Sequence, residues 1–324
     1  MAQDWPLLTE DWHDGRHIAL DELRAFFRNP VNAYLRRRLR LRLPEEDATF
    51  TDALPIDLDP LAKWSVADRL IRARLAGNES QDWAAYERAI GTLPAGGLGD
   101  ATAAAVSGTV EALLAHAEAL GVELSRDDPV PIDLEIAGDH RIVGVIECRS
   151  APPARGPATV TFSRPSPKQH LAAWLDLLCL VATDPETHWR SLVVRRKASG
   201  ERIEALTLVV PGATPDERRA RATGGLEVAV DIYRRGMCEP IPLFASLSPK
   251  LHQRSAKPGD WKGYQGAGDG YDAANEQVYG HLDLVGLTGI PARDDDPPGS
   301  GPGRAERFAD YLWGAVAESA EPGR

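Results

Sequence analysis

The stretch from residue 18 to residue 43 constrains the fold most, because it combines a helical apolar pattern, a proline break and a dense run of arginines. Its first apolar side chains recur at helical spacing, so one side of a helix can be buried while the charged side stays in water. They are Leu20, Leu23, Phe26 and Phe27. Pro30 disfavours helical backbone at the residue before it and suits the first turn of a new helix. The sequence therefore predicts a helix over 21–28 and a second helix that starts at Pro30 and uses Val31, Tyr34, Leu35 and Leu39.

The second helix is expected to carry five arginines within seven positions, in a chain whose formal net charge is −11. These arginines are Arg36, Arg37, Arg38, Arg40 and Arg42. Residues on a helix follow one another at about 100°, so the five would spread around most of its circumference and two or three at most could contact phosphates. Arg36 and Arg40 would share one face, and Arg38 and Arg42 another. The alternative is a solvated helix face whose charge is balanced by Glu45, Glu46 and Asp47.

Composition and charge limit the class of protein. With 324 residues and 43% hydrophobic composition, the chain can bury a sizeable core in one or two domains. An acidic balance argues against indiscriminate coating of nucleic acid, whose affinity comes largely from neutralised phosphates, but it leaves room for a local basic channel. No apolar run approaches the roughly 20 residues that span a bilayer, and the first residues lack the pattern of a signal peptide. We therefore expect no membrane contact and a cytoplasmic location.

Beyond the opening stretch, the pattern changes from helical to alternating near residue 129. Residues 1–128 are expected to form a helical region, with a connector up to residue 17, and residues 129–324 an α/β domain with an irregular C-terminal tail. The expected strands and helices of the second part follow the order β-β-β-α-β-β-α, which predicts a mixed sheet flanked by helices. The strands lie in a hairpin from about Pro129 to Cys148 with a turn at 138–139, and at 159–163, 191–196 and 203–210; the helices start at Pro167 and near Pro215. In the tail, residues 272–287 are ambiguous between helix and strand, and 304–318 form an amphipathic helix.

The order of these elements suits a nuclease, but the catalytic residues are incomplete. Magnesium-dependent nucleases need an acid at the end of one strand and an acid-x-lysine on the next, so that hard oxygen ligands hold the ion against a phosphate. Glu147 offers the first acid, whereas Val160 to Arg164 contains no carboxylate. We therefore interpret Glu147 as an exposed or ion-paired strand residue. The three cysteines and eight histidines show no zinc-site spacing, and no metal is expected.

Several motifs resemble the C-terminal region of RecC, the gamma subunit of exodeoxyribonuclease V. They include the opening Leu-Asp-Glu-Leu-x-x-Phe-Phe-Arg-Asn-Pro-Val-x-x-Tyr-Leu over 20–35 and the turn Gly-x-Leu-Pro-x-Gly-x-Leu-Gly over 91–99. The others are the helix from Leu58 to Gly77 and the Trp-Leu-x-x-Leu helix from Trp174. The match covers nearly the whole chain and is most specific in the first 100 residues. A complete gamma subunit is several times longer, so the resemblance implies that this chain is one part of such a subunit.

The resemblance implies a degenerate restriction-endonuclease-like fold, of the PD-(D/E)XK type, that has lost its catalytic residues. Glu147 stands where the first acid would be, Thr161 to Arg164 replaces the acid-x-lysine, and His170 with Trp174 replaces a glutamine and tyrosine of related nucleases. The DNA-binding candidates are the five arginines together with Arg164 and Lys168.

The expected function is a non-catalytic module that binds and guides DNA strands and docks RecB-type and RecD-type subunits in double-strand break repair by homologous recombination. ATP and Mg²⁺ would be used by those partner subunits, and this chain would need no cofactor of its own. Two alternatives stay open. One is an active Mg²⁺-dependent nuclease that uses Glu147 with Asp133 or Glu135, and the other is a pure protein-protein docking domain.

Overall fold

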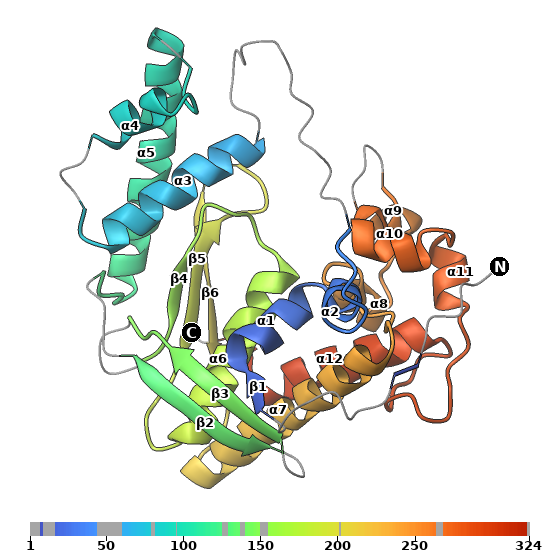
Figure 1. Cartoon of the computed structure of the whole chain (residues 1–324). Coiled ribbons are helices and arrows are strands. Elements are labelled where there is room, and N and C mark those ends of the chain that lie inside the picture. Colours follow the sequence, from blue (N-terminus) through green and yellow to red (C-terminus); the bar gives the residue numbers. More distant parts are fainter. Residues whose placement is uncertain are drawn as a thin grey trace.

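The computed structural model describes residues 7–8, 17–43, 60–78, 82–94, 96–124, 129–136, 140–149, 155–200, 202–263 and 268–322 (Figure 1). These residues form an α+β fold, which confirms the predicted class. They contain two sheets rather than the single mixed sheet that the sequence predicts. None of the helices in the described ranges is long and apolar enough to cross a bilayer. The acids Glu45, Glu46 and Asp47 and the hairpin turn at 138–139 lie outside the described residues.

The two opening helices bury the predicted residues. Helix α1 (Leu20–Arg28) buries Leu20, Leu23, Phe26 and Phe27, and helix α2 (Pro30–Arg37) buries Pro30, Val31, Tyr34 and Leu35. Asn29 lies between them in extended backbone, and its Oδ1 accepts a hydrogen bond from the backbone N–H of Asn32 at 3.0 Å. The proline and this N-cap separate α1 from α2.

The prediction that one helix carries all five arginines is wrong, because α2 ends at Arg37. Arg40 has a φ of 55°, which lies in the left-handed region and interrupts a right-handed helix. The backbone N–H of Leu41 then donates to the carbonyl of Leu35 at 2.9 Å. The chain therefore turns back toward α2 instead of continuing along its axis.

The first sheet has the order β1-β3-β2. Strands β2 (Val130–Ile136) and β3 (His140–Ile146) form the predicted antiparallel hairpin, and β1 (His17–Ala19) pairs parallel to β3. The expectation that residue 17 ends a connector is therefore wrong, because His17 belongs to β1. A strand of three residues is too short to show a periodic pattern in the sequence. Core residues of this sheet pack with α1 in one large cluster.

The second sheet has the order β4-β5-β6-β7. Its strands are β4 (Ala158–Val160), β5 (Ser191–Arg196), β6 (Ile203–Val209) and β7 (Glu321–Pro322). Helix α6 (Pro167–Thr183) is the crossover between the parallel strands β4 and β5. Between β3 and β4, the described backbone contact is one hydrogen bond, from Arg149 N–H to the carbonyl of Gly156 at 2.9 Å.

Helices cover both faces of the second sheet. On one face, α3 (Pro60–Leu75), α4 (Trp83–Ala89) and α5 (Gly97–Ala119) share an apolar cluster with β4 and β5 (Figure 1). On the other face, α6 packs against α7 (Pro215–Cys238) and α12 (Arg304–Ser319). The cores include residues on both sides of position 128, and the division into two domains stays a prediction.

The C-terminal tail is more regular than the sequence indicates. It contains α8 (Ser248–His252), α9 (Pro258–Trp261), the 3₁₀ turn η2 (Asp269–Tyr271), α10 (Ala273–Tyr279) and α11 (Leu284–Thr288). The ambiguous stretch 272–287 is therefore helical. These short helices gather beside α2 (Figure 1), where Tyr34 and Trp261 belong to one apolar cluster. Such short helices depend on this tertiary packing, which local periodicity does not reveal.

Candidate nucleic-acid interface

A groove of about 620 Å³ lies along α1 and α2, and arginines dominate its walls. Its lining residues are Ala25, Asn29, Asn32, Ala33, Arg36, Arg37, Arg40 and Arg42. Arg36 and Arg37 come from the last turn of α2, whereas Arg40 and Arg42 follow the reversal of the chain. The turn at Arg40 thus brings four of the five predicted arginines to one groove, which a continuous helix would have prevented.

The fifth arginine, Arg38, is not among the residues that line this groove. It is half-buried at the end of α2, and burial lowers the pKa of its guanidinium, while Cys238, Tyr34 and Tyr233 act in the opposite sense. Arg38 therefore lies near α7 rather than with the other four. The predicted pairing of Arg38 with Arg42 on one face is wrong, because these residues do not share a helix.

Among the residues that the structure describes, few acids oppose the arginines of the groove. Arg37 forms an ion pair with Glu22 of α1, and Glu22 also accepts a hydrogen bond from the hydroxyl of Tyr233 at 2.5 Å. Arg36, Arg40 and Arg42 are exposed and form no ion pair with any residue that the structure describes. Planar guanidinium groups with several N–H donors suit the geometry of phosphate oxygens.

Two further cations lie next to the groove, on the other side of Asn29. Asn29 also lines a smaller cavity of about 160 Å³, together with Arg28 and Lys168. Asp272 belongs to this cavity too, but its Oδ1 already accepts a hydrogen bond from Asn29 Nδ2 at 2.7 Å. The structure thus brings the predicted residue Lys168 close to the arginine groove, from the start of α6.

Arg164 lies elsewhere, because it lines neither of these two cavities. Its side chain is exposed and donates to the carbonyl of Ala198 in the loop between β5 and β6. Sequence reasoning missed Arg28, Asn29 and Asn32 as groove or rim residues. The Arg-Asn-Pro sequence at 28–30 was the available signal, since it sets the corner between the two helices.

The degenerate nuclease positions belong to different elements and have different contacts. Glu147 directly follows β3, is exposed, and lies 3.8 Å from a guanidinium nitrogen of Arg149. Thr161 follows β4 in the other sheet, where its hydroxyl contacts that of Ser163 at 3.1 Å. The alternative acid Asp133 is bound by Arg141, which lowers the pKa of its carboxyl. Glu135 is exposed on the same strand, β2.

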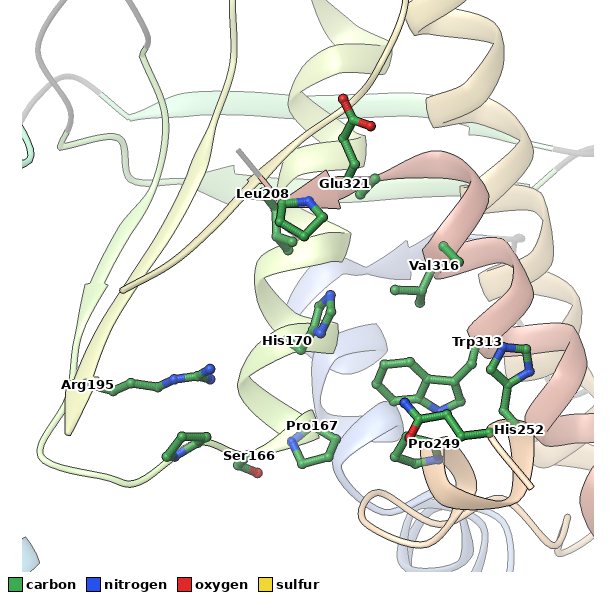
Figure 2. Close-up of a pocket in the computed structure, with 15 residues that line it drawn as sticks. Ser166, Pro167, His170, Arg195, Leu208, Pro249, His252, Trp313, Val316 and Glu321 are labelled. Carbon is green, nitrogen blue, oxygen red and sulfur yellow. The ribbon is translucent and has the colours of Figure 1, made fainter. Parts of the chain in front are cut away.

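His170 and Trp174 have different surroundings, although both belong to α6. His170 lines a cavity of about 590 Å³ and packs edge-on against Trp313 with ring centroids 5.6 Å apart (Figure 2). Burial, together with Arg195, lowers the pKa of His170. Trp174 is fully buried and its indole N–H donates to the hydroxyl of Ser319 at 2.9 Å. Trp174 therefore serves the core in this structure.

Metal binding has no evident site in the described ranges. Within them, no three side chains of His, Cys, Asp or Glu come close enough together to hold a metal ion. The expectation that this chain carries no metal or cofactor stays a prediction.

Comparison with known proteins gives a consistent set of relatives. The profile described as the RecC C-terminal domain matches residues 15–255. The RecBCD enzyme subunit RecC of Mycobacterium tuberculosis is 32% identical over 228 residues, which cover 70% of this chain and 19% of that protein. The same subunit of Mycolicibacterium smegmatis is 32% identical over 235 residues, covering 70% of this chain and 20% of that protein. Escherichia coli RecC is 28% identical over 83 residues, covering 26% of this chain and 7% of that protein.

These matches concern a limited part of each relative. The aligned region spans about a fifth of the length of the mycobacterial proteins. The profile match, over residues 15–255, includes both helices that form the groove and the whole of α6.

Proposed function

This chain belongs to the family of RecC C-terminal domains, and on that premise we propose that it binds and guides a DNA strand as a non-catalytic module of an exodeoxyribonuclease V gamma subunit. The module would act in double-strand break repair by homologous recombination. Its partners would be RecB-type and RecD-type subunits, which would use ATP and Mg²⁺. The name of the relatives, RecBCD enzyme subunit RecC, supports an assembly of this kind.

One observation carries the DNA-binding proposal. Four arginines line one groove, and Arg37 is the one among them that has an ion pair to a described carboxylate. Phosphate neutralisation by Lys and Arg provides most of the sequence-independent affinity for nucleic acid. Arg28 and Lys168 line the smaller cavity that shares Asn29 with the groove, where the carboxylates of Asp269 and Asp272 accompany them, so two more cations lie next to the groove.

The non-catalytic part of the proposal is supported by the surroundings of the acids. Glu147 has Arg149 within 3.8 Å, and Asp133 forms an ion pair with Arg141. An arginine beside a carboxylate competes with a divalent cation for its oxygens, and Mg²⁺ needs several oxygen ligands in octahedral geometry. The proposed nuclease-like fold is supported by the order of the hairpin β2-β3, strand β4, crossover helix α6 and parallel strand β5.

The DNA-binding proposal is tested with a fluorescein-labelled single-stranded oligonucleotide of mixed sequence. We expect the 324-residue chain to bind it with an affinity that falls as salt rises. The double variant Arg40→Gln/Arg42→Gln should weaken binding at low salt and lower the slope of log affinity against log salt by about 1.4, since each lost single-strand phosphate contact removes about 0.7. Fluorescence anisotropy at several salt concentrations measures both quantities.

Arg202→Gln/Arg219→Gln is the matched control, because it removes two exposed positive charges away from the groove. It should leave the affinity and the slope close to those of the parent chain. Equal effects of the two double variants would contradict a specific role of the groove. Unchanged DNA binding with lost association to RecB-type and RecD-type subunits would favour the docking domain instead. DNA cleavage with Mg²⁺ that Glu147→Ala abolishes would favour the active nuclease.

A further inference from the structure

The cavity of about 590 Å³ that His170 lines has the size and composition of a small-molecule site. It lies between the second sheet and helices α6, α8 and α12 (Figure 2). Sites for small molecules are mostly apolar, with a few polar groups that fix the orientation of the ligand. The apolar walls of this cavity come from Leu208, Val316, Ala317 and Ala320 and from four prolines, Pro165, Pro167, Pro249 and Pro322.

The charged groups of the cavity do not favour a charged ligand. Arg195 forms an ion pair with Glu204 at 3.1 Å and donates to Gln169 at 3.1 Å. Burial, together with Arg195, lowers the pKa of His170, which favours its neutral form. Glu321 also lines the cavity, but it is exposed to water. An anion would have to compete with the ion pair of Arg195, and a cation would meet the arginine itself, so the cavity suits an uncharged molecule.

His252 lines the cavity in one tautomer, which its neighbours determine. Its Nδ1 lies 3.1 Å from Asp310 Oδ1, and the other oxygen of Asp310 accepts from Arg254 at 2.7 Å. Burial raises the pKa of the Asp310 carboxyl, but the hydrogen bonds from Arg254, His252 and Ser300 outweigh it and lower the pKa. An ionised carboxylate can only accept hydrogen bonds, so Nδ1 carries the proton. In the neutral imidazole, Nε2 is then an acceptor.

Trp313 supplies a donor. Its indole is 8% exposed and lines the cavity, and Nε1 is shielded from water without an acceptor among the described residues. A buried donor without a partner costs free energy, which an oxygen of a ligand would recover. Four other indole N–H groups have acceptors 2.6–2.9 Å away; they belong to Trp64, Trp174, Trp189 and Trp261.

The donor and the acceptor lie at the end of the cavity away from strand β7. In Figure 2, Trp313 and His252 lie at one end, whereas Glu321 of β7 lies at the other. Helices α8 and α12, which carry these two polar groups, lie within the described ranges. Prolines from the loop before α6 and from α8 line the cavity as well. One side chain that donates and one that accepts are therefore combined with apolar walls.

We propose that this end of the cavity binds an uncharged planar heterocycle with a lactam group, whose carbonyl oxygen accepts from Trp313 Nε1 and whose N–H donates to His252 Nε2. A lactam carries an acceptor and a donor side by side without a net charge. The prolines and aliphatic side chains pack against the ring of the ligand. The site is independent of DNA binding at the arginine groove, since no described residue lines both.

The test uses carbostyril, an uncharged planar lactam, and the 324-residue chain labelled with ¹⁵N. Titration calorimetry should report saturable binding. The indole N–H resonance of Trp313 should move downfield, because the group gains an acceptor. The loss of this resonance from the spectrum of Trp313→Phe assigns it.

Three analogues of similar shape separate the contributions of the two hydrogen bonds. N-methylcarbostyril lacks the N–H donor, quinoline lacks the carbonyl and the N–H, and naphthalene lacks any polar atom. Loss of one hydrogen bond should weaken binding about fivefold, and loss of both should weaken it further. The analogues test the site without changing the protein.

Two protein variants test the assigned partners. Trp313→Phe and His252→Phe should each weaken carbostyril binding about fivefold and leave naphthalene binding unchanged. His252→Phe should not weaken binding of N-methylcarbostyril, which has no proton to donate. Trp64→Phe is the matched control, because it removes an indole N–H from α3, outside the cavity, and it should have no effect. Thermal unfolding of each variant establishes that it is folded.

Three results would overturn the proposal. They are an absence of saturable carbostyril binding, equal affinities for carbostyril and naphthalene, and an unchanged affinity in Trp313→Phe. Uridine and a thymidine oligonucleotide carry the same lactam chemistry, so competition with carbostyril distinguishes two sources of the ligand. Competition by uridine would support a free nucleoside, and competition by the oligonucleotide alone would support a base on a strand.

Discussion

The arginine groove and the cavity beside β6 are both formed around helices of one core, but the arginines that line them differ in their partners. Arg36, Arg40 and Arg42 lie at the groove without a described carboxylate partner. Arg195 at the cavity has Glu204 and Gln169 within hydrogen-bond distance. The first region therefore presents positive charge, and the second presents an apolar surface with its charge compensated.

This difference teaches that the partners of an arginine, rather than its presence, determine what it can bind. A guanidinium that is already paired has less to gain from a phosphate, since its ion pair must first be broken. The two regions nevertheless depend on each other through shared packing and one ion pair. The predictions below test that dependence, from the largest expected effect to the smallest.

Phe26→Ala should weaken both regions together. Phe26 is 1% exposed and contacts Phe27 and Tyr233 with ring centroids 5.2 and 5.1 Å apart. It belongs to the same cluster as Trp313, which lines the cavity. We expect a loss of about 3–5 kcal/mol in the free energy of unfolding, measured by urea denaturation. A stable variant that loses DNA binding alone would contradict a shared core.

Asp176→Asn should change how stability depends on pH. Asp176 of α6 pairs with Arg24 of α1 at 2.6 Å, and burial raises the pKa of its carboxyl to about 6, although Arg24 acts to lower it. Because the pKa is higher in the folded chain than in the unfolded one, this group's contribution is fully present below about pH 4 and is lost as pH rises to about 6. The loss should be no more than about 3 kcal/mol.

The variant should lack this decrease in stability between pH 4 and 6, which urea denaturation at several pH values would measure. Arg24→Gln is the complementary change, because it removes the charge that holds the pKa down and should extend the decrease above pH 6. Equal pH slopes for the parent chain and Asp176→Asn would contradict the assignment of this linkage to Asp176.

Asn29→Ala should affect the groove while sparing the cavity. The change removes the N-cap of α2 and the hydrogen bond to Asp272, at a cost of about 1 kcal/mol in stability. Oligonucleotide binding should weaken, because Asn29 lines the groove and sets the start of α2. Asp82→Ala removes the corresponding N-cap from α4, where Asp82 accepts from Ala85 N–H at 3.0 Å, and is the matched control. If both variants weaken DNA binding equally, the effect is one of general stability.

Local patterns were sufficient for the elements with strong periodicity. The apolar spacing in α1 identified buried residues such as Phe26, and the alternation that begins near residue 129 identified the hairpin. The helix that was expected to start near Pro215 is α7, and the hydroxyl of its N-cap Thr214 accepts from the backbone N–H of Glu217. These features depend on neighbours within a few residues. Short elements such as β1 and α11 carried no such signal.

The sequence by itself determined that five arginines lie close together and that an apolar helix face lies beside them, because both follow from spacing along the chain. The tertiary structure decided which arginines share a groove. The left-handed turn at Arg40 returns the chain toward α2 and so adds Arg40 and Arg42 to the groove, while Arg38 is half-buried near α7. No glycine or proline marks this turn. It is held because the backbone N–H of Leu41 donates to the carbonyl of Leu35 and because Leu39 packs against the apolar cluster that contains Tyr34 and Trp261.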